Sequence, residues 1–356
     1  MWYLRVLSRS ENARVFHLAE RRELKFPNGE FLRTPLLVPS FSSRIAEVEK
    51  PLNASREFID GPFLISAFDI AKEYVAAPFD FAGAIFLDSG GYELTKESDL
   101  SDVGSEPPGD PGDWSLERHR NVLSSWKPAT AGAVVSYDHP LLRVSIEEQI
   151  EQALGLFDSR PDLAAELLIK PETHDQRFLD VRSAISHVGK LAPFHAIGIT
   201  EKEIGNSVLE RMLNVARLRS ALRNVGLNTP IHVFGSLDTI TTLFYFIAGA
   251  DIFDGLTWLR YAFKDGRTIY RQDYGITDLG ISTKAPKVEA RCWSNNYQYM
   301  KDMELEMQRF AASQDFNVFK YHGDLLRSAY KKVDAEVSTK WAAVVEDHIP
   351  TGARKV

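Results

Sequence analysis

The stretch Asp88-Ser89-Gly90-Gly91-Tyr92 places a carboxylate, two glycines and an aromatic ring directly after the apolar run 84–87. Four apolar residues bounded by polar ones predict a short buried strand. Glycine frees the backbone to turn sharply and lets a ligand approach the main chain. We therefore expect Asp88 at the C-terminal tip of a strand, beside open backbone and a ring that can stack. An Asp/Gly turn without any function is the alternative for this stretch alone.

The same design recurs further along the chain. Asp138 and Asp254 each end another apolar run, and Gly198 and Gly235 fall at the ends of two more. Carboxylates that share one site repel each other and lose hydration, which is a cost that function usually explains. We therefore expect these strand ends to meet at one functional site.

Two carboxylates across a cleft are the minimal set for cleaving a glycosidic bond with retention of configuration. One attacks the anomeric carbon, and the other handles the proton of the leaving group. A third carboxylate can accept hydrogen bonds from the N–H groups of a purine. Tyr92 and Phe234 are candidates to hold a flat base by stacking, which contributes roughly 1–3 kcal/mol per base. Gly198 leaves backbone groups accessible for contacts to the base edge.

Eight strand-like runs, mostly separated by helical patterns, position these residues. The runs cover 34–41, 63–67, 84–88, 133–138, 166–170, 195–199, 231–235 and 251–254, and helical patterns cover 114–126, 144–157, 204–225 and 237–248. This alternation predicts an α/β fold, a (β/α)8 TIM barrel, in which catalytic residues lie at the C-terminal ends of the strands.

We expect a single domain, 1–356, in four parts. An N-terminal β-cap covers 1–33, with a hairpin turn at Asn28-Gly29, and the barrel covers 34–283. Residues 284–317 break the rhythm and resemble an insertion before the last helix, and 318–356 form a closing helix and tail. The segment 96–113 is rich in Pro, Gly and acidic residues and predicts a mobile loop.

The composition restricts the class of protein. A net charge of -7 argues against nucleic-acid binding through overall positive charge, although a local basic patch is compatible with it. With Cys292 as the one cysteine, no internal disulfide can form. No apolar run has the length of a membrane span, and the first residues do not read as a signal peptide, so we expect a cytoplasmic protein. The best candidates for phosphate contacts are basic residues near the insertion: Lys284, Lys287, Arg291, Lys301, Lys320, Arg327, Lys331 and Lys332.

The segment 88–92 resembles the DSGG-aromatic signature of the tRNA-guanine transglycosylases. The resemblance continues in order and at similar spacing through 136–138 (SYD), 195–198 (HAIG), 234–236 (FGS) and 249–254 (GADIFD), with Arg260 following. It covers roughly residues 30 to 335. Each piece is weak alone, but five in register favour membership of this superfamily.

The resemblance implies a role for each matching position. Asp254 would be the nucleophile that displaces guanine and forms a covalent glycosyl-enzyme, and Asp88 would relay the proton. Asp138 would bind the purine edge. Other substrate contacts would come from the signature turn, from the base-stacking rings and from backbone at two strand ends: Ser89, Gly90, Gly91, Tyr92, Gly198, Ile199, Phe234, Gly235 and Arg260. Glu172 falls near the position of a base-binding Gln in the family, through a loose alignment.

The departures from the family are also informative. Its members usually carry three clustered cysteines and a histidine that bind zinc, whereas this chain keeps only Cys292 and His322 in comparable places. Two ligands do not make a closed zinc site, so we expect no metal and no other cofactor. The family's Gln after the aromatic is Glu93 here, and Ile199 replaces a second Gly. These changes favour the divergent branch that inserts 7-deazaguanine bases into DNA.

The sequence therefore predicts an enzyme that exchanges guanine in a polynucleotide for a free 7-deazaguanine such as preQ0, with DNA favoured over tRNA. A tRNA-guanine transglycosylase is the first alternative. A non-catalytic nucleic-acid-binding subunit is another, against which the presence of both Asp88 and Asp254 argues. A barrel glycosidase or phosphate-binding enzyme that does not act on nucleic acid also stays open. The oligomeric state and any partner protein are not predicted.

Overall fold

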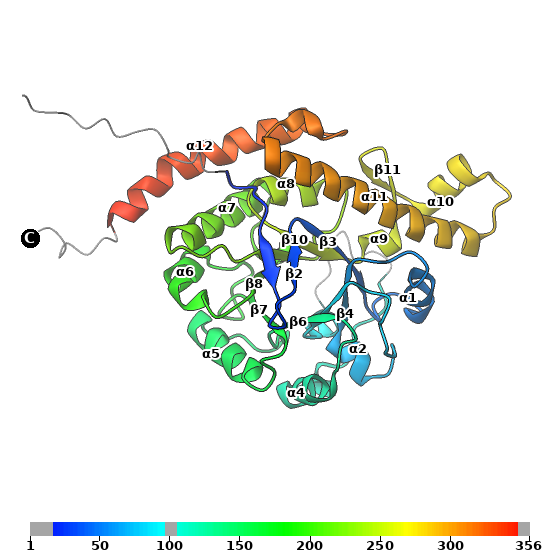
Figure 1. Cartoon of the computed structure of the whole chain (residues 1–356), viewed down its shortest axis with the longest axis horizontal. Helices are drawn as coiled ribbons and strands as arrows, with labels where there is room; N and C mark the ends of the chain where they lie inside the picture. Colours follow the sequence, from blue (N-terminus) through cyan, green and yellow to red (C-terminus); the bar gives the residue numbers. More distant parts are fainter. Residues whose placement is uncertain (1–16, 97–104, 348–356) are drawn as a thin grey trace, which may run out of the picture.

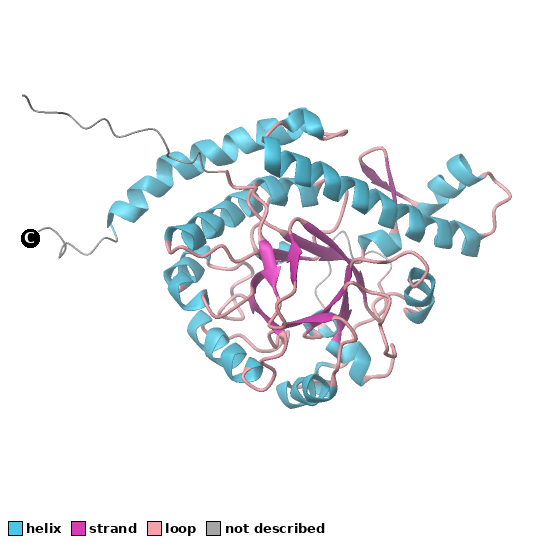
Figure 2. Cartoon of the chain, viewed as in Figure 1, coloured by secondary structure: helices cyan, strands magenta, loops and turns pink. Residues whose placement is uncertain are grey.

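The computed structural model describes residues 17–96 and 105–347. At its centre is a closed barrel of eight parallel strands, ordered β3 to β10, with β10 paired back onto β3 (Figures 1 and 2). All eight predicted strands and the (β/α)8 architecture are confirmed. The strands are β3 (Leu36–Phe41), β4 (Pro62–Ser66), β5 (Ala84–Asp88), β6 (Ala131–Val135), β7 (Ala164–Ile169), β8 (Ala196–Thr200), β9 (Ile231–Phe234) and β10 (Ile252–Gly255).

Helices surround the barrel (Figure 2). They begin where the sequence supplies caps: the Ser115 side chain accepts a hydrogen bond at the start of α4, and Ser145 forms a capping box with Glu148 at the start of α5. The four predicted helical patterns correspond to α4, α5, α7 and α8. The helices between the first and last barrel strands are α1 (Glu49–Ser55), α2 (Ala67–Ala71), α3 (Gly91–Leu94), α4 (Leu116–Ser125), α5 (Ile146–Phe157), α6 (Val181–Ser186), α7 (Val208–Asn224) and α8 (Thr241–Ile247).

The described part of the N-terminal cap closes one end of the barrel. Strands β1 (Glu23–Lys25) and β2 (Phe31–Arg33) pair antiparallel around the predicted Asn28-Gly29 turn, where Gly29 has φ +91°. Leu24 and Phe26 pack into the inner core beside the inward-facing residues at the strands' N-terminal ends. Figure 1 shows the hairpin lying across the barrel. Residues 1–16 of the predicted cap lie outside the described residues.

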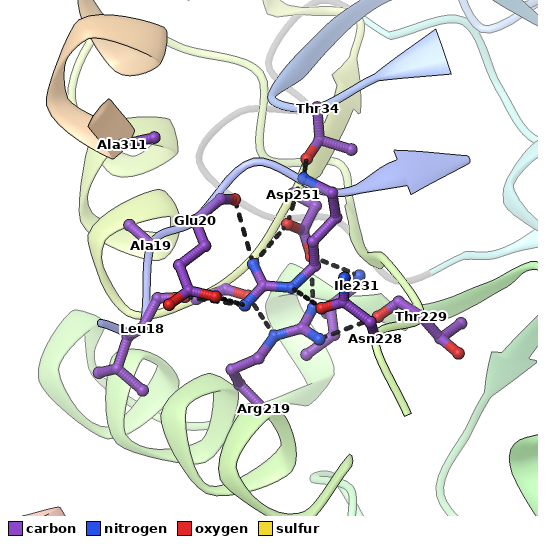
Figure 3. A network of polar contacts seen from close by, with 12 residues as sticks. Leu18, Ala19, Glu20, Thr34, Arg219, Asn228, Thr229, Ile231, Asp251 and Ala311 are labelled. Atoms are coloured by element: carbon purple, nitrogen blue, oxygen red, sulfur yellow. Dashed lines mark hydrogen bonds and ion pairs between the residues drawn. The ribbon is translucent and has the colours of Figure 1, made fainter. Parts of the chain in front are cut away.

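A buried ionic network fastens this cap to the barrel (Figure 3). The Asp251 carboxylate, just before β10, pairs with Arg22 at 2.9 Å and with Arg219 of α7, and it accepts the Ile231 N–H at 2.8 Å. Burial lowers the pKa of Arg219 to about 9, against the opposing effect of Asp251. One carboxylate thus joins the cap, α7 and the starts of β9 and β10.

The predicted insertion, 284–317, consists of one long helix, α11 (Ala285–Ser313), and the short 3-10 turn η6 (Phe316–Val318). Residues 256–283 before it also carry elements outside the barrel: α9 (Thr257–Arg260), β11 (Ala262–Lys264), β12 (Arg267–Ile269) and α10 (Arg271–Tyr274). Helix α11 packs on β3 and α1 and so covers the closing seam of the barrel. The final helix, α12 (Gly323–Asp347), packs on α7 and α8 instead (Figure 1).

Helix α11 is buried along much of its length. Met300, Met303, Met307 and Phe310 are buried at helical spacing, and Cys292, Asn296 and Tyr297 are buried in the preceding part. Within it, buried Asn296 donates to the carbonyls of Trp258 and Tyr261 and accepts the Phe263 N–H at 2.7 Å. Asn296 thus holds the segment 258–263 to α11, although an asparagine in a sequence is typical of a loop.

The predicted mobile loop 96–113 lies partly outside the described residues, and its described end forms the 3-10 turn η2 (Pro111–Asp113). Across residues 17–96 and 105–347, no helix is both long and apolar enough to cross a membrane.

We predict that Asp251→Ala lowers the free energy of unfolding by about 3–5 kcal/mol, because two buried guanidinium groups lose their counter-ion. Urea unfolding followed by circular dichroism measures this change. Glu23→Ala is the control, since its carboxylate meets Lys25 on the surface at 4.0 Å and should contribute less than about 1 kcal/mol. Equal losses in the two variants would contradict the role given to Asp251.

Candidate active site

A cleft of about 530 Å³ opens at the C-terminal ends of the barrel strands. It is lined by strand ends and by the loops that follow them. Nine of the predicted site residues line it: Asp88, Ser89, Gly91, Tyr92, Asp138, Phe234, Gly235, Asp254 and Arg260. These distant segments therefore meet at one cleft.

The turn after β5 needs both of its glycines. Gly90 has φ +93°, and a Cβ there would lie 2.7 Å from Cβ of Phe68. A Cβ on Gly91 would lie 2.5 Å from Oδ2 of Asp138. The Gly90 N–H donates to Asp88 at 3.3 Å, and the Trp114 indole donates to the Ser89 carbonyl at 2.9 Å. The turn therefore fixes Asp88 and brings Asp138 against its backbone.

Asp88 is a buried carboxyl group whose pKa lies well above its ordinary value. Burial is the main cause, and the neighbouring carboxylates of Glu93 and Asp254 add to it, raising the pKa of Asp88 to about 8. Glu93 lies in the same environment, where burial and Asp69 raise its pKa to about 7. Hydroxyl groups of Ser42 and Ser66 donate to the two Glu93 oxygens at 2.6 and 2.9 Å, which holds this side chain in place.

Asp254 has the opposite surroundings. The Ser40 hydroxyl donates to Oδ2 at 2.8 Å, the Gly235 N–H donates to Oδ1 at 3.0 Å, and His232 Nε2 lies 3.3 Å from Oδ1. The Gly255 N–H donates in turn to the Ser40 oxygen, at 3.1 Å. Two donors and a ring nitrogen therefore hold the Asp254 carboxylate at the floor of the cleft.

His232 and Glu166 form a fully buried pair beneath this floor, with Nδ1 and Oε1 2.7 Å apart. Burial alone would lower the pKa of His232, but Glu166 and Asp254 outweigh it and raise the pKa to about 9. The two neighbouring carboxylates thus favour the protonated form of the ring. The sequence analysis missed this pair, although His232 lies two residues before the inward-facing Phe234, and strand side chains alternate in direction.

Asp138 belongs to a group of four charged residues rather than acting alone. Lys170 and Arg143 lie 3.4 and 3.7 Å from its two oxygens, and both cations also pair with Glu203. All four residues line the cleft. We call Asp138, Arg143, Lys170 and Glu203 the ionic quartet. It presents carboxylate acceptors and cationic donors side by side, and the sequence analysis identified only its first member.

Four predicted site residues do not line the cleft. Gly198 and Ile199 are buried within β8 and do not line the cleft, because the Phe234 ring fills the space that a Cβ on Gly198 would occupy. The following residues, 200–203, line it instead. Glu172 accepts the Ile146 N–H at the start of α5, at 3.2 Å, and is also absent from the lining. Gly90 shapes the turn without lining the cleft.

The two predicted stacking rings each have a covered side. Phe234 stacks on His232 with ring centroids 3.9 Å apart. Arg44 lies over the Tyr92 ring at 5.2 Å, and Arg260 donates to the Tyr92 hydroxyl at 3.0 Å. Both rings border the cleft, and stacking on a flat ligand stays a prediction for them.

Cys292 and His322 have separate structural roles. Cys292 packs with Ala262 and Tyr274, and burial raises its pKa to about 11. His322 contacts the Gly266 carbonyl at 2.6 Å. Within residues 17–96 and 105–347, no three His, Cys, Asp or Glu side chains are placed to hold a metal ion.

The predicted basic patch does not border the cleft, since none of its eight residues lines it. Lys301 and Arg327 pair instead with Glu304 and Asp324, one turn away on their own helices. The cations that do line the cleft are Lys96, Arg143, Lys170, Lys202 and Arg260.

No protein-family model matches the chain, and no curated protein matches it either. The chemistry of the cleft must therefore be argued from its own residues.

We predict that both ring nitrogens of His232 carry protons at pH 7.5, which nitrogen-detected NMR of labelled histidines can measure. Because its pKa is raised, the stability that the charge contributes is complete below about pH 6.5 and is lost as pH rises through about 9. Glu166→Gln should lower the pKa of His232 by removing the closer anion. Buried His119, whose pKa burial lowers to about 3, is the internal control and stays neutral. A neutral His232 at pH 7.5 would contradict this assignment.

Proposed function

We propose that this chain is a base-exchange transglycosylase that replaces a guanine of a polynucleotide, with DNA as the preferred substrate, by a 7-deazaguanine such as preQ0. The observation that carries the proposal is the contrast between two carboxyl groups in one cleft. Burial and neighbouring carboxylates raise the pKa of Asp88 to about 8, whereas Asp254 faces two hydrogen-bond donors and the His232 ring. Such a contrast separates an acid from a nucleophile in retaining glycosyl transfer.

The first half-reaction cleaves the N-glycosidic bond. An Asp254 oxygen bonds to the anomeric carbon while the bond from that carbon to the guanine nitrogen breaks, and the electron pair leaves with the base. Asp88 supplies a proton to the departing purine. In the second half-reaction, the ionised Asp88 takes a proton from the incoming base, whose nitrogen attacks the same carbon and releases Asp254. Two displacements at one carbon retain its configuration.

The ionic quartet supports binding of a purine edge. Guanine presents N–H donors beside a carbonyl acceptor, and the quartet presents the oxygens of Asp138 and Glu203 beside the Lys170 ammonium. Each cation has two carboxylate neighbours, so a base that contacts one carboxylate leaves the cation paired with the other. Tyr92 and Phe234 border the same cleft and provide stacking surfaces.

The preference for DNA rests on the departures from the tRNA enzymes, namely the missing cysteine cluster and the altered residues at Glu93 and Ile199. A tRNA substrate is the alternative. A non-catalytic binding subunit is the less economical hypothesis, because it leaves the buried charges around Asp254 without a purpose.

The decisive experiment supplies labelled guanine, and separately a labelled 7-deazaguanine, together with duplex DNA or tRNA. Label that enters the polymer demonstrates base exchange, whereas release of guanine without incorporation indicates a hydrolase. Incorporation into tRNA but never into DNA would replace the DNA proposal with the tRNA alternative.

We predict that Asp254→Asn lowers the exchange rate by roughly 10⁴-fold or more, because the nucleophile is lost while the shape of the side chain is kept. Asp88→Asn should also be nearly inactive. Denaturing electrophoresis can reveal a covalent adduct of this variant if Asp254 still attacks the anomeric carbon without proton transfer from residue 88. Glu172→Gln is the matched control, since that carboxylate lies outside the cleft and should be replaceable. Exchange by Asp254→Asn at the wild-type rate would rule out the mechanism.

We predict that kcat/KM for exchange falls as pH rises through about 8, because the first half-reaction needs the protonated form of Asp88. Activity that requires a proton on a group is present below its pKa and is lost above it. Glu93→Gln removes a neighbouring negative charge that raises the pKa of Asp88, so this falling limb should move to lower pH. An unchanged pH profile in Glu93→Gln would show that the group titrating in the profile is not Asp88.

A further inference from the structure

The loop after β6 presents two adjacent leucines to solvent at the rim of the cleft. Leu141 is 62% exposed and Leu142 is 53% exposed. Pro140 and Leu141 line the cleft itself. Single exposed apolar residues are common on protein surfaces, but two neighbours at the mouth of a binding site call for a physical explanation.

This loop is held rigidly by its own side chains. The Leu141 N–H donates to Nδ1 of His139 at 3.2 Å, and Nε2 of the same ring lies 3.0 Å from the Pro111 carbonyl oxygen. Arg143 donates to the carbonyls of His139 and Leu142 at 3.3 and 3.0 Å. The leucines are therefore exposed on a fixed turn, which lowers the entropy cost of inserting them into a partner.

Arg143 connects this turn to the base-binding wall of the cleft. Its guanidinium contacts Asp138 and Glu203 of the ionic quartet while it clamps the leucine turn. The position of the leucines is thus fixed relative to the place where a purine would bind.

We propose that Leu141 and Leu142 form an apolar wedge that enters the base stack of duplex DNA when a nucleotide turns out of the helix into the cleft. This inference rests on the proposed function and specifies its substrate as double-stranded. A base inside a duplex cannot reach Asp254 without leaving the stack, which costs a few kcal/mol and opens an apolar gap. Leucine and proline side chains are typical occupants of such gaps.

Two lysines, Lys96 and Lys202, line the same cleft as Leu141, together with the acidic residues Asp110 and Glu201. The carboxylates Asp88 and Asp254 are buried. The two lysines of the lining can contact the phosphates that flank a turned-out nucleotide. A free nucleobase or an isolated nucleoside would need neither the cations nor the wedge.

The test compares Leu141→Ala/Leu142→Ala with wild type for labelled-guanine incorporation into duplex plasmid DNA, into the same DNA after denaturation to single strands, and into tRNA. We expect kcat/KM on the duplex to fall about tenfold or more, and the value on single strands to change less than about twofold. Leu305→Ala/Leu325→Ala is the matched control, since these leucines are 49% and 52% exposed but do not line the cleft. Equal losses on duplex and single strands, or no loss on the duplex, would overturn the wedge.

A binding measurement keeps the wedge distinguishable from the exchange reaction. Duplexes that carry 2-aminopurine next to guanine brighten when the neighbouring stack opens. Wild-type protein should raise this fluorescence, and the double leucine variant should not. The wedge stands and the proposed exchange falls if this leucine-dependent rise occurs without incorporation of label in any polymer. Without a rise in the wild-type protein, the wedge is rejected, even if exchange proceeds.

Discussion

The site depends on one buried histidine between two carboxylates. His232 lies inside the barrel, with Glu166 on one side and Asp254 on the other, at 2.7 and 3.3 Å. An isolated charge in such an interior is strongly unfavourable, and the two carboxylates raise the pKa of the ring to about 9. The protonated ring lowers the cost of burying both anions. The surroundings of Asp254 are therefore set one layer below the cleft, by side chains that do not line it.

Much of the fold follows from local sequence pattern. Each barrel strand is a short apolar run, and alternation along β5 and β10 directs Asp88 and Asp254 inward with the inner-core residues Phe86 and Ile252. The meeting of these strand ends follows from the parallel barrel, whose strands all end on the same face. The same alternation directs His232 inward beside Phe234, so this histidine was predictable. Its ionic partner was not, because pairing across strands depends on the register of the closed barrel.

The features that sequence analysis missed depend on contacts between distant segments. The ionic quartet joins loops after β6, β7 and β8, and no spacing along the chain indicates that Lys170 would face Asp138. The buried side of α11 includes Asn296, whose amide replaces water with three backbone partners. A polar residue that is satisfied only in the folded chain resembles a surface residue in the sequence.

Strand β10 is anchored at both ends, by Asp251 below and by the contacts of Asp254 above. Asp251 forms ion pairs with two arginines from different parts of the chain. Only three residues later, Asp254 accepts hydrogen bonds from Ser40 and Gly235. Because the strand is held at both ends, the Asp254 carboxylate has little freedom to move. Under the proposed chemistry, the sugar would stay bound to an immobile Asp254 while one base leaves the cleft and another enters. The free bases would then enter and leave through a part of the cleft that the bound polynucleotide does not cover.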